Sequence, residues 1–203
     1  MAEVARFQTP VFRASFPHLF KAQAPMEGQG EPKYSVSAVW TPSEFTDREK
    51  QLWQKLMKAI DDECKSRFKK GLKELKALNA EGGNYKLVPR DGKAKADMEG
   101  YGEGTVFASL TTKMRPGVID REKNEISPEE GNDGEIYAGC FCRATVTVYS
   151  YDNKGKGVAL GLMNVQKVKD GDRLDSRTDA AEDFEDDLED LDDGGDTSDF
   201  LDD

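Results

Sequence analysis

The sequence predicts a mainly β domain that contains one long inserted α-helix and is followed by a disordered acidic tail. Alternating apolar and polar residues indicate strands at 33–41, 105–113 and in a long hairpin at 135–169. Apolar residues recur at helical spacing between 46 and 81. The last 25 residues hold fourteen acidic side chains and no Lys or Arg. Such blocks of like charge cannot bury enough apolar surface to fold. We therefore expect a folded domain at 1–178 and a tail at 179–203.

The predicted strands differ in which face they bury. Residues 6–20 alternate loosely, and Pro10 and Pro17 favour an edge strand or a strand start. In the next two strands, one face of each is apolar: Tyr34, Val36, Ala38 and Trp40 in the first, and Val106, Ala108 and Leu110 in the second. Residues 115–120 are expected to form a turn and a short strand, and residues 84–104 and 121–134 to form polar loops.

The predicted helix has a clear start. Thr46 and Glu49 fit a capping box, in which a hydroxyl and a carboxylate satisfy the free backbone donors of the first turn. Gly71 is expected to interrupt the helix, and Gly82-Gly83 to end it. One apolar stripe runs along it, formed by Trp53, Leu56, Met57, Ile60, Cys64 and Phe68.

The hairpin is expected to turn at 152–157. The core face of its first arm is small and apolar: Cys140, Cys142, Ala144, Val146 and Val148. Its second arm is apolar on both sides for much of its length, which predicts a central strand.

Charge separates the two parts of the chain. There are 40 acidic and 29 basic residues in total, so the domain carries about +3 and the tail −14. A mildly basic domain suits a polyanion, and an acidic tail can imitate one. No apolar run approaches membrane-spanning length, and the N-terminus lacks the pattern of a signal peptide. Three cysteines do not suggest a disulfide framework, so we expect a cytoplasmic protein.

Catalytic and metal sites are not expected. The single histidine, His18, lies in a predicted loop without the companions of a triad or a metal cluster. Cys140 and Cys142 lack a second cysteine pair at zinc-ligand spacing and are better explained as core residues. The run Gly100-x-Gly102-x-Gly104 lacks the Lys-Ser/Thr ending of a phosphate-binding loop. We therefore predict no catalytic residue, no metal, no cofactor and no enzymatic activity.

Single-stranded nucleic acids are held by basic grooves whose aromatic side chains stack on bases. Three predicted strands carry such chemistry on their polar faces, and the hairpin tip adds two lysines. The residues are Lys33, Ser35 and Ser37; Phe107, Thr111 and Lys113; Phe141, Arg143, Thr145, Thr147, Tyr149 and Tyr151; and Lys154 and Lys156. The alternative for Phe107 and Phe141 is burial under the helix or in a dimer interface. Tyr149 and Tyr151, beside the basic tip, favour a binding role.

The tail ends with two apolar residues among carboxylates. Phe200, Leu201, Asp202 and Asp203 resemble a short docking peptide for another protein. The alternative is a tail that only increases solubility.

The order of several stretches resembles one known family. They are Lys33-Tyr34-Ser35, Pro89-Arg90-Asp91-Gly92, Arg115-Pro116-Gly117-Val118-Ile119-Asp120, Tyr137-Ala138-Gly139, Val146-x-Val148-Tyr149-x-Tyr151 and Lys156-Gly157-Val158-Ala159-Leu160-Gly161, followed by the acidic tail with Phe200. The chain resembles the bacteriophage single-stranded-DNA-binding proteins, the helix-destabilising proteins of phage replication. The resemblance implies an oligonucleotide/oligosaccharide-binding (OB) barrel of five strands with an inserted helix. It also implies a tail that contacts replication proteins and competes with DNA, and it adds Arg90 and Arg115 as candidate DNA contacts.

We therefore expect sequence-independent binding of single-stranded DNA during phage replication, recombination and repair, in the cytoplasm of the infected bacterium. The expected partners are single-stranded DNA and, through the tail, replication proteins such as a polymerase or a helicase-primase; a homodimer stays open. One alternative is an acidic-tailed chaperone or interaction protein for basic partners that has no DNA groove. A strand-annealing recombination protein on the same fold is another.

Overall fold

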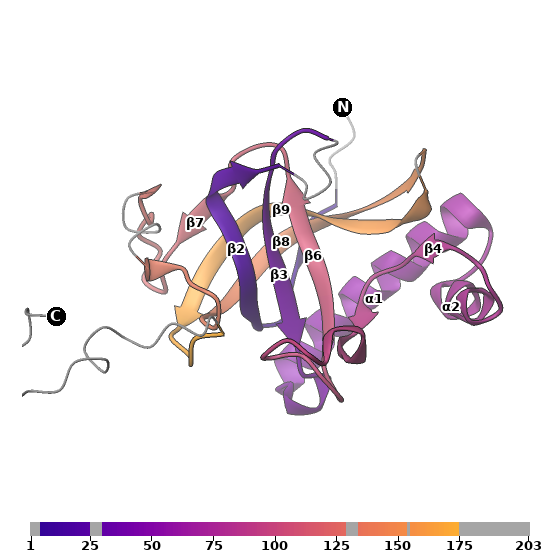
Figure 1. Ribbon diagram of the computed structural model, residues 1–203, viewed down its shortest axis with the longest axis horizontal. Coiled ribbons are helices and arrows are strands. Elements are labelled where there is room, and N and C mark those ends of the chain that lie inside the picture. Colours follow the sequence, from indigo (N-terminus) through magenta and orange to yellow (C-terminus); the bar gives the residue numbers. More distant parts are fainter. Residues whose placement is uncertain (1–4, 25–29, 129–133, 154, 175–203) are drawn as a thin grey trace, which may run out of the picture.

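The computed structural model describes residues 5–24, 30–128, 134–153 and 155–174. The predictions for Lys154 and for the tail, including Phe200, Leu201, Asp202 and Asp203, concern residues outside these ranges. Nine strands form one mixed sheet, with two α-helices beside it (Figure 1). The long elements are β2 (Phe12–Gln23), β3 (Lys33–Trp40), α1 (Asp47–Phe68), α2 (Leu72–Ala80), β6 (Val106–Thr112), β8 (Phe141–Asp152) and β9 (Lys156–Lys169). The short strands are β1 (Phe7–Gln8), β4 (Tyr85–Lys86), β5 (Arg90–Asp91) and β7 (Gly117–Ile119).

Five strands pair in a closed circuit. β8 pairs with β2, β2 with β3, β3 with β6, β6 with β9, and β9 returns to β8. Only the β6–β9 pairing within this circuit is parallel. The short strands β1, β4, β5 and β7 pair at its edges. Because every strand of the circuit has two neighbours, none of the five leaves a whole edge unpaired.

The alternation predicted for the strands is confirmed. Val36, Ala38 and Trp40 of β3 join the buried core, as do Ala108 and Leu110 of β6. The predicted small core face of the hairpin is present, since Cys140, Cys142, Ala144 and Val146 are all buried. The second hairpin arm is central, as expected, because β9 pairs with both β8 and β6. The opposite faces form an outer surface, on which Ser37, Val39 and Phe107 are nevertheless buried.

The helix begins as the sequence predicts. The Thr46 side chain accepts the Glu49 amide, and the Glu49 carboxylate accepts the Thr46 amide, which completes the capping box. Glu49 also accepts the amide of Val11 at 3.2 Å, so the helix N-terminus is fastened to the start of β2. Gly71 separates α1 from α2, and the amide of Leu72 donates to Asp61 at 2.7 Å.

Three expectations about loops need correction. The predicted loop at 84–104 contains β4, β5 and the 3-10 turn Gly92–Lys95. His18 lies within β2, opposite Ser35, and not in a loop. The first hairpin arm begins at Phe141, not at 135. Pairing with distant strands decides these segments, and a local pattern does not register such pairing. Within the described residues, no helix is long and apolar enough to cross a membrane.

Candidate nucleic-acid interface

The outer face of the central strands is built from small side chains. Strand register places Ser37 beside Ser109, and Ser35 beside Thr111. Thr111 in turn lies beside Gly161 of β9. We call this surface the sheet floor, and it comprises Ser35, Ser37, Ser109, Thr111, Ala159 and Gly161. Small residues leave the backbone surface open to a flat ligand, and hydroxyl groups can donate to or accept from it.

A groove lies over part of this floor. It has a volume of about 820 Å³ and is bounded on one side by α2 and by the segment 85–91. On the floor side it is lined by Phe107, Ser109, Thr111, Tyr151 and Ala159. Figure 1 shows the β8–β9 hairpin extending past the closed circuit, above the two helices. The groove therefore brings together three residues that the sequence nominated, Arg90, Phe107 and Tyr151.

Tyr149 and Tyr151 follow one another on the outer face of β8. Tyr149 is 42% exposed, and its ring carbons lie 3.5 and 3.7 Å from where a Cβ on Gly161 would be. The Tyr149 ring therefore lies over Gly161 at ordinary contact distance, whereas a Cβ at 161 would clash with Thr147 Oγ1 at 2.5 Å, so the glycine accommodates the Thr147 side chain. Tyr151 is half-buried and lines the groove, and burial raises the pKa of its phenol. Both rings are placed to contact a ligand that crosses the floor.

Phe107 faces outward but is not accessible. It lies outside the core cluster, yet only 2% of it is exposed. Arg90 Cζ and Lys95 Nζ each lie 5.1 Å from its ring centroid, and Tyr101 meets it edge-on at 5.3 Å. The cover is therefore the segment 90–101, and neither the long helix nor a dimer interface is needed to bury it. In this conformation Phe107 cannot stack on a base.

Three of the nominated cations, Lys33, Lys113 and Arg115, lie where β3 begins and β6 ends. Lys113 forms an ion pair with Glu31, and that hydrogen bond, with the Lys113 charge and a smaller contribution from Lys33, lowers the pKa of Glu31. Arg115 is exposed beyond this end of β6. Exposed ion pairs of this kind are easily exchanged for another anion.

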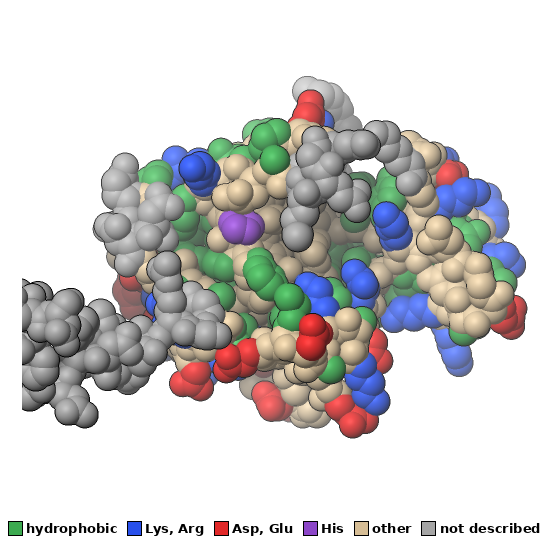
Figure 2. Space-filling model, viewed as in Figure 1, with side chains coloured by type: hydrophobic (Ala, Val, Ile, Leu, Met, Phe, Trp, Pro, Cys, Tyr) green, Lys and Arg blue, Asp and Glu red, His purple; other side chains and the backbone are tan. Residues whose placement is uncertain are grey.

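The hairpin tip provides a further cation. Lys156 is exposed, with its Nζ 4.0 Å from Asp152, and Asp152 also lies 3.7 Å from Arg67. β4 runs beside this tip, with Tyr85 opposite Lys156. Figure 2 shows cationic side chains gathered at this end of the molecule, over α1 and α2. The tip therefore extends the groove with positive charge.

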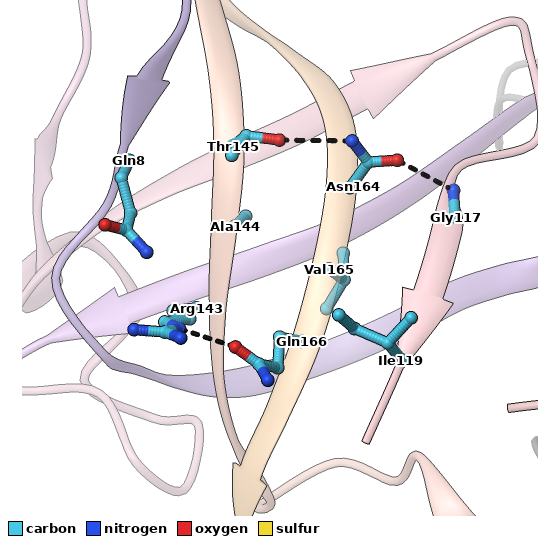
Figure 3. Close-up of a pocket in the computed structure, with 9 residues that line it drawn as sticks. All are labelled: Gln8, Gly117, Ile119, Arg143, Ala144, Thr145, Asn164, Val165 and Gln166. Atoms are coloured by element: carbon cyan, nitrogen blue, oxygen red, sulfur yellow. Dashed lines mark hydrogen bonds between the residues drawn. The ribbon is translucent and has the colours of Figure 1, made fainter. Parts of the chain in front are cut away.

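Arg143 is not part of this groove. Its Nε donates to Gln166 at 2.7 Å in a separate pocket of about 290 Å³ between β1 and β7 (Figure 3). Asn164 in the same pocket accepts the amide of Gly117 at 3.3 Å. Phe141 is also remote from the floor, with Lys169 Nζ 4.5 Å above its ring. Strand alternation predicted the correct face for both residues, but they lie at the start of the 12-residue β8, whereas Tyr151 lies near its end, so the two ends of the strand contribute to different surfaces.

Sequence reasoning missed Phe16, Lys95 and Tyr101. Phe16 is 46% exposed and has a φ of 47°, a left-handed value that is uncommon for a non-glycine residue. It sits in a bulge of β2, where the register with β3 shifts between Ser15 and His18. The only signal in the sequence was the dipeptide Phe16-Pro17, which does not by itself announce an exposed ring.

The cysteines are buried and packed. Cys140 and Cys142 have their sulfur atoms 3.7 Å apart, and hydrogen bonding from Cys140 together with burial raises the pKa of Cys142. Burial likewise raises the pKa of Cys64 to about 11. Within the ranges that the structure describes, no group of three His, Cys, Asp or Glu side chains is arranged to hold a metal.

A small-residue floor bordered by exposed aromatic rings and cations is the kind of surface that single-stranded nucleic-acid-binding proteins use.

Comparison with known proteins agrees with this interpretation of the surface. The profile of the family described as "Enterobacter phage Enc34, ssDNA-binding protein" matches residues 6–195. A relative from Acyrthosiphon pisum secondary endosymbiont phage 1, "Putative protein p50", is 36% identical over 162 residues, which cover 79% of this chain and 81% of the relative.

Solved structures give the same assignment. The single-stranded DNA-binding protein from bacteriophage Enc34 in complex with ssDNA superposes with a TM-score of 0.66 at 27% identity, over 83% of this chain and 89% of that one. Gp2.5, a single-stranded DNA binding protein encoded by bacteriophage T7, has a TM-score of 0.54 over 91% of this chain and 97% of its own, and at 16% identity it supports the fold alone. The protein is a homologue of phage single-stranded-DNA-binding proteins. It belongs to the Enterobacter phage Enc34 ssDNA-binding protein family.

Proposed function

We propose that this protein binds single-stranded DNA without sequence specificity, across the sheet floor and the groove beside it. The observation that carries the proposal is the juxtaposition of Tyr149, Tyr151 and Arg90 around a floor of small side chains. Aromatic rings stack on any base, and cations neutralise any phosphate, so neither contact reads sequence. The closed circuit of five strands is, in this proposal, an OB barrel, and its relative that was solved with ssDNA supports the assignment.

The biological setting is part of the same proposal, and membership of the family supports it. A protein that coats single strands would act in phage replication, recombination and repair in the cytoplasm of the infected host. Binding makes and breaks no covalent bond, so the proposal requires neither a catalytic residue nor a cofactor.

The acidic tail is proposed to regulate binding. Fourteen carboxylates joined to the domain are at high effective concentration beside its cations. They compete with DNA for those cations until DNA displaces them. The terminal Phe200 and Leu201, with Asp202 and Asp203, are proposed to dock on replication proteins.

The test compares full-length protein with protein truncated after Thr178, using labelled oligonucleotides across a salt series. We expect binding by both forms, tighter binding by the truncated form, and the largest difference at low salt where screening is weakest. Equal or weaker binding by the truncated form would refute tail competition. If neither form binds, the proposed function fails and the acidic chaperone for basic partners takes its place.

A further inference from the structure

One cluster on the outer face is not explained by the fold. Lys95 Nζ lies 5.3 Å from the ring centroid of Phe16, 5.1 Å from that of Tyr101 and 5.1 Å from that of Phe107. Arg90 lies over the same Phe107 ring. Two cations and three aromatic rings are thus collected between β2 and β6. Figure 2 shows hydrophobic and cationic side chains together on this face, beside a hollow lined by polar side chains and backbone.

The two cations lie close together, and the charge of Asp97 acts on Lys95. Among the ion pairs of the described residues none involves Arg90 or Lys95, whereas Lys93 in the same turn pairs with Glu103 at 2.9 Å. Partial burial and the nearby Arg90 charge lower the pKa of Lys95, and together they outweigh the charge of Asp97, which raises it. Because like charges held together are unfavourable, an anion that contacts both Arg90 and Lys95 would stabilise this arrangement.

A second polar group in the cluster is also unsatisfied. The hydroxyl of Tyr101 is buried and has no hydrogen-bond partner within the described part of the chain. A buried polar group without a hydrogen-bond partner destabilises the folded state. The segment that covers Phe107 therefore contains a buried hydroxyl group whose loss of hydration is not offset by a hydrogen bond within the described residues.

The third feature of the cluster is the exposed ring of Phe16. Its left-handed backbone conformation is strained for a residue with a side chain, and strain of this kind is concentrated at functional sites. The bulge directs a large apolar ring to solvent, next to two unpaired cations. A ligand that presents a flat apolar face beside a negative charge would satisfy both features. A nucleotide has this combination.

We propose that Phe16, Lys95 and Arg90 form a nucleotide subsite at the β2 bulge, in which the Phe16 ring stacks on a base and the two cations hold the backbone phosphates next to it. This inference rests on the proposed binding of single-stranded DNA. It places one end of the DNA path at Phe16, on the opposite side of the sheet floor from Tyr149 and Tyr151. The path then runs from the hairpin over β9, β6 and β3 to β2. Glycines at 100, 102 and 104, all with positive φ, shape the segment that carries Lys95.

The test measures oligonucleotide affinity against salt for Phe16→Asn, Arg90→Gln and Lys95→Gln, with Lys93→Gln as the matched control. Asparagine tolerates the left-handed backbone, so the ring is removed without adding strain. Phe16→Asn is expected to weaken binding about 5- to 150-fold, the loss of one stacked base, with the salt slope unchanged. Arg90→Gln and Lys95→Gln are each expected to reduce the log–log slope by about 0.7, the value for one phosphate contact on a single strand. Lys93→Gln should change neither.

A labelling experiment keeps the test independent of folding. The full-length protein is treated with an amine-reactive reagent with and without a saturating oligonucleotide, and modification is mapped by mass spectrometry. Lys95 should be protected by DNA, and Lys93 should not. The subsite is refuted if the wild-type protein binds but Lys95 stays reactive, or if all three variants keep wild-type affinity and slope. If the wild-type protein does not bind at all, the proposed function itself has failed.

Discussion

Replacement of Tyr149 and Tyr151, singly and together, gives the most informative mutational test of the groove. The two residues lie on one face of β8, about 7 Å apart at the usual rise of a strand. Tyr149 is exposed, and Tyr151 lines the groove. At that separation two rings are able to stack on different bases.

The expected magnitudes follow from this geometry. Each change to alanine should cost about 1–3 kcal/mol, which corresponds to about 5- to 150-fold in Kd. If the rings hold different bases, the double variant should lose the sum of the two effects to within about 0.5 kcal/mol. If they hold the same base, the second change should add little.

The assay is fluorescence anisotropy of a labelled oligonucleotide at fixed salt, with thermal unfolding recorded for every variant. Tyr137→Ala is the matched control, because Tyr137 lies outside the groove and its hydroxyl bonds to Asp170 and to the backbone of Gly171. We expect this control to lower stability and to leave affinity unchanged. Unchanged affinity in both Tyr149→Ala and Tyr151→Ala, with the control behaving as expected, would refute the groove as the DNA path.

Three further predictions concern the domain. Thr46→Ala should lower the free energy of unfolding by about 1 kcal/mol in denaturant titrations, because it removes the cap of α1, and an unchanged value would count against the capping box. Burial raises the pKa of Glu49, but hydrogen bonds from Thr46 and Val11 outweigh burial and lower the pKa below its ordinary value. The stabilisation by Glu49 is therefore present above the unfolded-state pKa and is lost as pH falls through the folded-state pKa. Glu49→Gln should therefore flatten the acid side of the profile of unfolding free energy against pH. With its thiol pKa near 11, buried Cys64 should resist alkylation at pH 8 until the protein unfolds, and rapid labelling of native protein would contradict its burial.

Much of the fold could be predicted because each long strand places one alternating apolar face in the core. The alternation in β3, β6 and β8 predicted which residues enter the core, and the pair Thr46 and Glu49 predicted the start of α1. Such patterns are local, so the sequence displays them directly. The family followed from the order of short stretches along the chain, and the profile match confirms it.

The details of the candidate site were harder to predict from the sequence. The outward face of Phe107 was predicted correctly, but its burial depends on Arg90, Lys95 and Tyr101, which approach from a segment expected to be a polar loop. Arg143 shares the outward face of β8 with Tyr149, yet it lies near the other end of the strand, where residues of β1 and β7 line a separate pocket with it. Both outcomes depend on tertiary packing, which alternation along one strand does not encode.

Mapping the DNA path on the full-length protein would show whether single-stranded DNA crosses the sheet floor. Oligonucleotides that carry a photoreactive base would be cross-linked to the protein, and the modified residues identified by mass spectrometry. The proposed function predicts cross-links to Tyr149, Tyr151 and Phe16, on both sides of the sheet floor. Cross-links confined to Phe141, Tyr137 or the Arg143 pocket, with none on the floor, would contradict it.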